Sequence, residues 1–318
     1  MMTVQDRREA LGAFVLPRGD KMSGTDYKNE TDWLAARQNG IGASEAAAIL
    51  GYSRFASPWS VWARKTGKVP AMRGAPSEMA EWGHRLEEPV AVKFTEVTGR
   101  KVTDPGDYWI ERNGILSCTP DRFQVTAYSP ADKMGPRGVL ELKCAWFHAW
   151  QEWERQVPRA YQIQLQQAMH CCGCDYGSFA VLGNGCKFKL FHVKPHPKFS
   201  AIVERLEWWW DQYVIGDRPP PTDPSEATSK ALTEMYPEVK VERVDLEGEE
   251  LTAAHELRTK ACAAIAVNED LKNGATNVIK AAMGTAEFGV LPDDSGYSWR
   301  QGKKFRIFRR IEKCPQPK

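Results

Sequence analysis

The sequence predicts a mixed α/β protein whose β-sheet is covered by helices. Segments with apolar residues at helical spacing come first, short strand-like runs lie in the middle, and a further helix with two more strand-like runs follows. Helices before and after a block of strands are typical of layered α/β domains. The chain has 318 residues, of which 42% are hydrophobic, so it is long enough to bury a sizeable core.

The charge and the cysteine content narrow the classes of protein that fit. The formal net charge is only +2, so a DNA-binding surface would need local clusters of Lys and Arg. Eight cysteines in a chain without an N-terminal signal peptide favour a cytoplasmic protein with reduced thiols. Every apolar stretch is shorter than the roughly 20 residues that cross a bilayer, so we expect no membrane span.

Three parts are expected along the chain. Residues 1–26 mix charged residues, glycine and proline without a regular period, which is typical of a tail. Residues 27–222 form the core, because the run Pro219-Pro220-Pro221 indicates a boundary near its end. Residues 223–318 form a C-terminal extension of helices and a β-hairpin.

The extension ends in a basic stretch. Helical patterns cover about 249–272 and 277–283, and a β-hairpin is predicted around a turn at 301–302. Residues 300–318 contain eight Lys or Arg and one acid. Such a stretch is suited to hold a DNA backbone by charge neutralisation. A solvated terminal hairpin has the same composition, so both interpretations stay open.

The first half of the core is predicted to be helical. Apolar residues recur at helical spacing over 33–67, with two turns that divide the segment into short helices. A longer helix should begin at Ser77, carry Glu87 and end at Gly99. A kink is possible at Pro89. The buried stripe of this helix would comprise Met79, Trp82, Leu86, Val90 and Phe94.

Short strand-like runs lie between turn residues in the middle of the chain. They predict a small antiparallel meander from residues 108–110, 115–118 and 139–143. A helix follows between Pro158 and Gly173. Two more strand-like runs and a Trp-rich helix complete the core, at 178–182, 187–193 and 199–215.

The segment GVLELKC carries the strongest chemical signal. The two-residue period of a strand places Glu141 and Lys143 on one face, while Leu140 and Leu142 point to the other. Asp121 lies at a turn after a strand, and a hairpin can return it beside Glu141. We therefore expect two carboxylates and one ammonium group to converge.

This combination favours a metal-dependent hydrolase of phosphodiesters. Two carboxylates suit Mg²⁺, which prefers oxygen ligands and keeps several waters, and Mn²⁺ is expected to substitute for it. Lys143 could orient or deprotonate the attacking water and offset negative charge in the transition state. Surface strands often alternate Glu and Lys, however, so these residues alone do not establish the chemistry.

Five segments follow one another along the chain: WLAARQNGIGASEAAAILG, WGHRLEEPVAVKF, CTPDRF, GVLELKC and VPRAYQIQLQQAM. Together they resemble the YqaJ-type viral recombinase family, relatives of phage lambda exonuclease. The resemblance runs from Trp33 to Pro221 and does not cover the C-terminal third. It implies a restriction-endonuclease-like PD-(D/E)xK core with a central mixed β-sheet flanked by helices.

The resemblance also implies roles for individual residues. Asp121 and Glu141 would bind the metal, with Glu87 added from its helix, and Lys143 would be the catalytic lysine. Gln164 resembles the active-site glutamine of the family, although neighbouring glutamines leave its register open.

Two residues of the first segment match the positions that hold a 5′-phosphate in lambda-type exonucleases. They are Arg37, whose guanidinium is suited to bidentate phosphate contact, and Ser44, which we expect at a helix N-cap. A salt-bridging Arg and a capping Ser without a ligand would show the same pattern.

By resemblance, the chain is a DNA exonuclease that resects one strand of duplex DNA from its end, in the 5′ to 3′ direction, for phage-type recombination. The expected partners are double-stranded DNA ends and a single-strand annealing protein. A homo-oligomer is also expected, because lambda exonuclease is a ring-shaped trimer. The alternatives are a structure- or end-specific endonuclease on the same core and a non-catalytic scaffold that binds DNA ends.

Three further features have two interpretations each. His84 lies one helical turn before Glu87, where it could contact a metal, relay a proton or simply pack. The cysteines between Cys171 and Cys186 could hold a metal cluster, but a single CxxC pair favours buried thiols. The run Trp208-Trp209-Trp210 lies in a helix with other apolar residues, which favours core or subunit packing over base stacking.

Overall fold

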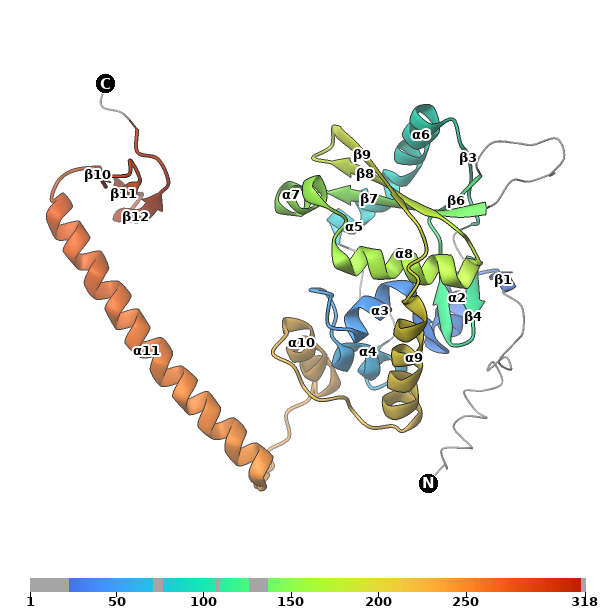
Figure 1. Ribbon diagram of the computed structural model, residues 1–318. Helices are drawn as coiled ribbons and strands as arrows, with labels where there is room; N and C mark the ends of the chain where they lie inside the picture. Colours follow the sequence, from blue (N-terminus) through green and yellow to red (C-terminus); the bar gives the residue numbers. More distant parts are fainter. Residues whose placement is uncertain (1–22, 71–76, 107–108, 126–136, 316–318) are drawn as a thin grey trace. The chain divides into compact units, whose positions relative to one another are not determined.

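The computed structural model describes residues 23–70, 77–106, 109–125 and 137–315 (Figure 1). The chain divides into two compact units, Met1–Val239 and Lys240–Lys318. Most of the expected tail, residues 1–22, lies outside the described residues. Residues 23–26, the last four of the expected tail, form a strand that pairs with residues 109–112.

The first unit alternates helices and short strands. Its helices are α2 (Glu30–Gln38), α3 (Ala43–Ile49), α4 (Pro58–Lys65), α5 (Glu78–Arg85), α6 (Glu87–Thr98), α7 (Phe147–Arg155), α8 (Arg159–Cys172), α9 (Phe199–Trp209), the π-helix η1 (Trp210–Ile215) and α10 (Glu226–Met235). Its strands are β1 (Ser23–Asp26), β2 (Ile41–Gly42), β3 (Lys101–Thr103), β4 (Trp109–Asn113), β5 (Leu116–Cys118), β6 (Arg122–Val125), β7 (Arg137–Ala145), β8 (Gly177–Gly183) and β9 (Lys187–Val193).

The central sheet has five strands in the order β3-β6-β7-β8-β9. β7 and β8 are parallel, because the chain crosses over through α7 and α8 between them, and the other pairs are antiparallel. Helices α6 and α8 lie on opposite sides of this sheet (Figure 1). The predicted mixed sheet flanked by helices is confirmed.

The two faces of β7 are buried against different helices. Leu140 and Leu142 pack in one apolar cluster with Val90 and Phe94 of α6. Val139 belongs to the larger cluster on the α8 side. The strand period then places Glu141 and Lys143 on the α8 side as well, as the alternation in the sequence predicts.

The meander predicted over residues 108–143 is wrong, because its strands belong to two different sheets. β4 and β5 pair in a small sheet with the order β1-β4-β5-β2, whereas β6 and β7 belong to the central sheet. The chain changes sheet at Thr119-Pro120, where proline has no N–H group to continue a ladder. Tyr108 lies outside the described residues.

The long helix expected after Ser77 is two helices, α5 and α6, which meet at Leu86. Pro89 explains the break, because its ring would clash with the carbonyl four residues earlier, whereas the first turn of a new helix tolerates proline. Met79 and Trp82 are exposed rather than buried. The expected apolar stripe is therefore correct only in α6.

The later helices of the core follow the prediction. α8 begins after Pro158 and ends at Gly173, which adopts a left-handed conformation with φ 59°. The Trp-rich segment is helical from Phe199 to Ile215, with a π-helical last part. Trp209 and Trp210 are buried in the core, as expected, while Trp208 is 43% exposed.

The first unit extends beyond the predicted boundary at residue 222. Helix α10 packs on α4, and the hydroxyl groups of Ser57 and Thr228 lie 2.7 Å apart in a buried contact. The proline run therefore lies within this unit, and residues 223–239 belong with the core rather than with the extension.

Over residues 240–315, the second unit consists of one helix and a small sheet. Helix α11 (Glu249–Met283) is continuous, so the two helices expected here are a single one. Gly274 costs about 1 kcal/mol inside a helix but keeps its backbone hydrogen bonds, so it does not end α11. The predicted hairpin of β11 (Gly296–Gln301) and β12 (Arg306–Ile311) is confirmed, with β10 (Phe288–Val290) as a third antiparallel strand.

Candidate active site

Three of the residues predicted to carry chemistry converge on the central sheet. Asp121 precedes β6, and the antiparallel pairing of Arg122 with Leu140 brings it beside β7. The Nζ atom of Lys143 lies 2.8 Å from Oε2 of Glu141 and 3.1 Å from Oδ2 of Asp121. The structure therefore joins the Asp, the Glu and the Lys in one hydrogen-bonded cluster.

Backbone and side-chain donors fix both carboxylates. The N–H group of Leu142 donates to Oδ2 of Asp121 at 2.7 Å. Glu141 is 1% exposed and accepts a hydrogen bond of 2.8 Å from Nε2 of Gln164. Each carboxylate is thus held by the lysine and by one further donor.

The structure settles the register of the glutamines on α8. Gln162 donates to the carbonyl of Val157, and Gln166 donates to the carbonyl of Lys194. Only Gln164 of these three reaches the cluster, and it does so across the space between α8 and β7. This placement agrees with the position implied by the family resemblance.

Burial and neighbouring charges shift the pKa of Glu141 and the pKa of Lys143. Burial, and then the charge of Asp121, raise the pKa of Glu141 to about 7 despite the neighbouring ammonium group. Burial alone would lower the pKa of Lys143, but the charges of Asp121 and Glu141 outweigh it and raise that pKa. Lys143 is therefore held as a cation, which suits it to orient water and offset negative charge.

Glu87 lies at the margin of this cluster rather than within it. It is the first residue of α6, and its Oε1 atom lies 3.3 Å from Nδ1 of His84. Its Oε2 atom is 3.8 Å from the guanidinium of Arg122. Burial, and then the charge of Asp121, raise the pKa of Glu87, so the two carboxyl groups are near each other.

The donor set of the cluster fits a magnesium ion with few protein ligands. Asp121 and Glu141 offer carboxylate oxygens, which are the hard donors that Mg²⁺ prefers, and this ion usually keeps several waters. Within the described part of the chain, no three His, Cys, Asp or Glu side chains converge closely enough to hold a metal ion by themselves. Asp121 and Glu141 thus lie close together, whereas Glu87 is too far away to complete a three-residue metal site.

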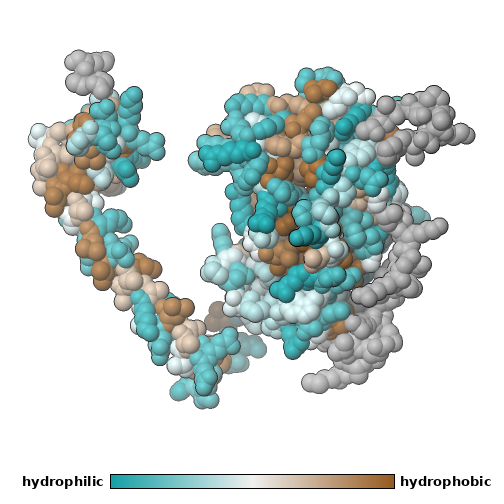
Figure 2. Space-filling model, in the orientation of Figure 1, coloured by the Kyte–Doolittle hydropathy of each residue, from teal (hydrophilic) through white to brown (hydrophobic). Residues whose placement is uncertain are grey.

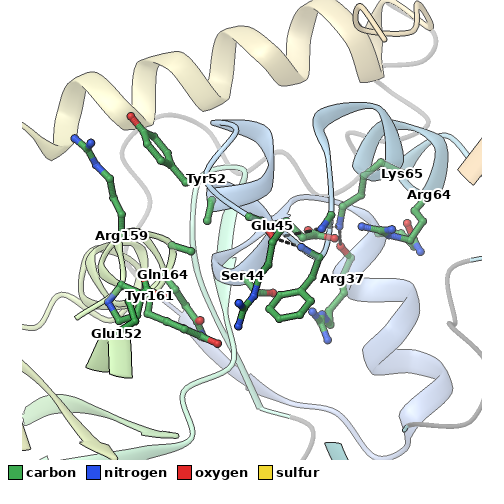
Figure 3. Close-up of a pocket in the computed structure, with 18 of the residues that line it drawn as sticks. Arg37, Ser44, Glu45, Tyr52, Arg64, Lys65, Glu152, Arg159, Tyr161 and Gln164 are labelled. Atoms are coloured by element: carbon green, nitrogen blue, oxygen red, sulfur yellow. Dashed lines mark hydrogen bonds and ion pairs between the residues drawn. The ribbon is translucent and has the colours of Figure 1, made fainter. Parts of the chain in front are cut away.

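A cavity of about 490 Å³ lies beside the cluster. Arg37, Ser44 and Lys65 line one side, and Tyr161 and Gln164 of α8 lie across from them (Figure 3). The residues that the sequence analysis assigned to a 5′-phosphate therefore share a cavity with the glutamine that contacts the carboxylates.

Arg37 is held from two directions at the end of α2. Its guanidinium carbon lies 4.6 Å from the centre of the Trp33 ring, and its carbonyl accepts a 2.7 Å hydrogen bond from Nζ of Lys65. Ser44 is exposed and lines the cavity. It is the second residue of α3, not the N-cap as expected, because Gly42 occupies that position.

A buried ion pair beneath Arg37 was not found from the sequence. Nζ of Lys65 lies 2.7 Å from Oε2 of Glu45, which also accepts a hydrogen bond from the Gly42 N–H group. Burial would raise the pKa of Glu45, but the charge of Lys65 and these hydrogen bonds outweigh it and lower that pKa. The two residues are 20 positions apart in the sequence, so no local pattern pairs them.

The cavity contains further cations that the sequence analysis missed. The guanidinium of Arg159, in the first turn of α8, lies 4.7 Å from the centre of the Tyr52 ring. Arg54 and Arg64 also line the cavity. Arg159 could have been identified from the segment VPRAY, because it lies directly after a proline that begins a helix.

The cysteines expected as a possible cluster are divided between two places. Cys171, Cys172 and Cys174 are buried, whereas Cys186 is exposed in the turn between β8 and β9. The sulfur of Cys172 lies 3.6 Å from that of Cys118, which the sequence did not single out. The expectation of buried thiols is therefore correct for Cys171, Cys172 and Cys174 and wrong for Cys186.

The fold and the cluster define a mixed α/β protein with an Asp-Glu-Lys centre on one face of its central sheet. Residues 32–175 match the model of the YqaJ-like viral recombinase domain. They contain Arg37, Ser44, Asp121, Glu141 and Gln164. This part of the chain is therefore similar to the YqaJ-like viral recombinase domain.

Known proteins are similar over most of the chain. The "Uncharacterized protein YqaJ" of Bacillus subtilis (strain 168) is 28% identical over 282 residues, which cover 86% of this chain and 84% of that protein. A match of this length includes part of the second unit.

Two solved structures are also similar. The alkaline exonuclease LHK-Exo from Laribacter hongkongensis is 17% identical, with a TM-score of 0.43, and covers 73% of this chain and 99% of its own. A phage-related exonuclease from Haemophilus somnus 129PT is 15% identical, with a TM-score of 0.39, and covers 56% of this chain and 96% of its own.

Proposed function

We propose that the protein is a metal-dependent DNA exonuclease that resects one strand of linear double-stranded DNA from its end. The family match supports a role in viral-type recombination. The cluster of Asp121, Glu141 and Lys143 supports phosphodiester hydrolysis, because it combines oxygen donors for a divalent cation with a fixed ammonium group.

The hydrogen bond between Gln164 and Glu141 is the observation that carries the proposal. Gln164 lines the cavity that contains Arg37 and Ser44, and it also donates to a catalytic carboxylate at 2.8 Å. A terminal phosphate held in the cavity would therefore lie next to the reacting centre. This arrangement favours cleavage close to a DNA end over cleavage within a duplex.

The chemistry divides among the residues of the cluster. Asp121 and Glu141 would hold Mg²⁺, or Mn²⁺ in its place, with Glu87 available from α6. When bound, the ion polarises the scissile phosphate and lowers the pKa of its water. Lys143 orients the attacking water by hydrogen bonding and offsets the charge that develops on the phosphate. Gln164 keeps Glu141 in position through its amide.

A 5′ to 3′ direction follows from the proposed use of the cavity. The guanidinium of Arg37 is suited to bind a terminal phosphate through two hydrogen bonds, and the exposed hydroxyl of Ser44 can add a third. A strand held by its 5′-phosphate is cut from that end, which leaves a 3′ overhang. Such an overhang is the substrate that a single-strand annealing protein requires, and a homo-oligomer would retain the duplex.

Incubation of the full chain with Mg²⁺ and two DNA forms tests this function. A linear duplex with 5′-phosphates should be converted to mononucleotides and single strands, while a covalently closed circle should stay intact. Removal of the metal with EDTA should stop the reaction, and Mn²⁺ should restore it. Cutting of the closed circle would instead support the endonuclease, and binding without cleavage would support a scaffold.

A further inference from the structure

Within the second unit, helix α11 lacks the packing that usually stabilises a helix. It has 35 residues, which corresponds to about 50 Å, and Met283 at its end is its one buried residue. Leu257 is 70% exposed, Leu271 67% and Val278 71%. Helical stability comes mainly from the burial of an apolar face. These exposed side chains therefore indicate a surface that another helix covers.

The apolar residues of α11 follow a seven-residue repeat. Figure 2 shows hydrophobic residues recurring along this helix between hydrophilic ones. The first row of the repeat is Ala254, Ala261, Asn268, Ala275 and Ala282. The second row, three residues further on, is Leu257, Ala264, Leu271 and Val278. Together the two rows, here called the seam, have the alternating spacing of four and three residues that defines a coiled coil.

The second unit leaves this seam uncovered. Met283 contacts the sheet at Gly289, and the ammonium of Lys280 lies 5.7 Å from the ring of Trp299. Both Met283 and Lys280 fall on the side of the helix opposite the seam, at the second and sixth positions of the repeat. The sheet therefore occupies one side of α11 and the seam is left for a partner.

We propose that the seam of α11 binds the same seam of a second copy of this chain, as a parallel two-stranded coiled coil. Four of the five residues in the first row are alanines, so two copies can approach closely over their whole length. The fifth residue is Asn268, whose amide donates to the carbonyl of Ala264 within its own helix. In a parallel, in-register pair, each Asn268 meets its counterpart, which fixes register and favours two strands.

The charges that flank the seam also favour parallel pairing of identical helices. In a parallel pair, Lys260 lies beside Ile265 of the second copy, and Lys272 lies beside Val267. No two like charges meet in this arrangement. In an antiparallel pair, Arg258 would lie beside Lys272 of the second copy, which repels it. The inference is independent of the proposed nuclease activity.

Disulfide trapping in the full chain tests the pairing. In a background with Cys186→Ser and Cys262→Ser, the substitution Ala261→Cys introduces a thiol in the seam, and Ala266→Cys introduces one on the outer side. Parallel pairing brings the two Ala261 positions to about 6 Å between Cα atoms, a distance that a disulfide spans. Mild oxidation should convert the Ala261→Cys chain into a covalent dimer and leave the Ala266→Cys chain uncrosslinked.

Charged substitutions provide a second measurement. Leu257→Glu with Leu271→Glu should abolish the cross-link at position 261, while Ala263→Glu with Ala266→Glu on the outer side should preserve it. Equal or absent cross-linking at positions 261 and 266 would overturn the proposal. A helix that docks on its own core, or that pairs in the antiparallel direction, would give this result. If the variant with Leu257→Glu and Leu271→Glu fails to fold, the comparison of Ala261→Cys with Ala266→Cys still decides the question.

Discussion

The amide of Gln164 on α8 donates a hydrogen bond of 2.8 Å to Glu141 on β7. This contact joins the Asp-Glu-Lys cluster to the cavity that contains Arg37 and Ser44. In the proposed function, one side chain therefore connects hydrolysis of a phosphodiester with recognition of a strand end.

Substitution of Gln164 tests this connection. Gln164→Ala should lower the rate of nucleotide release by about 10- to 100-fold, because Glu141 loses the donor that orients it. Gln166→Ala is the matched control, since Gln166 bonds to a carbonyl at the exposed side of α8. Single-turnover rates on a 5′-phosphorylated duplex measure both. Equal rates for the two variants would show that the Gln164 contact is not used.

Lys143 is expected to be essential for the chemical step. Lys143→Ala should lower hydrolysis by at least ~100-fold, because the fixed ammonium group no longer offsets the developing charge. DNA binding, measured by fluorescence anisotropy in Ca²⁺, should change little. Lys187→Ala is the control, because Lys187 is exposed and paired with Glu154 on the surface. Full cleavage by the Lys143 variant would contradict the assigned site.

Arg37 should determine the preference for a phosphorylated end. Arg37→Ala removes a charge-assisted phosphate contact, so the preference for a 5′-phosphate over a 5′-hydroxyl should fall by about tenfold or more. Cleavage of the 5′-hydroxyl substrate should be almost unchanged. The exposed Arg205, which lies over Trp208, provides the control in Arg205→Ala. A preference that survives in the Arg37 variant would remove this role.

The buried pair of Glu45 and Lys65 should stabilise the fold beneath Arg37. Lys65→Met leaves Glu45 buried without its partner and should lower the free energy of unfolding by about 3 kcal/mol. Combined Glu45→Gln and Lys65→Met should be less destabilising, because no charge is left unpaired and Gln can still accept from Gly42. Urea unfolding followed by Trp fluorescence compares the variants. Equal losses in both would mean that the ion pair itself is unimportant.

The sequence predicted the centre of the site because its geometry is local. Glu141 and Lys143 are two residues apart on one strand, so the strand period alone places them on one face. Asp121 could be added because it lies at a turn after a strand, from where a hairpin can return it beside Glu141. By contrast, Glu45 and Lys65 are joined only by the packing of α3 on α4, which no periodicity reveals.

The errors in the predicted fold have similar causes. β5 and β6 are adjacent in the sequence, yet a proline between them sends the chain to another sheet. Met79 and Trp82 follow the apolar period of a buried helix but are exposed in α5, because Pro89 divides that helix from α6. Period and composition identify elements, whereas the partners of each element depend on tertiary packing.

The direction of resection is the most direct test of the proposed function. A linear duplex is labelled at either the 5′ or the 3′ end of one strand, phosphorylated at both 5′ ends, and incubated with the full chain and Mg²⁺. The proposed 5′ to 3′ direction predicts that the 5′ label is released as a mononucleotide from the start, while the 3′ label stays in long fragments until late. Early release of the 3′ label as a mononucleotide would contradict it.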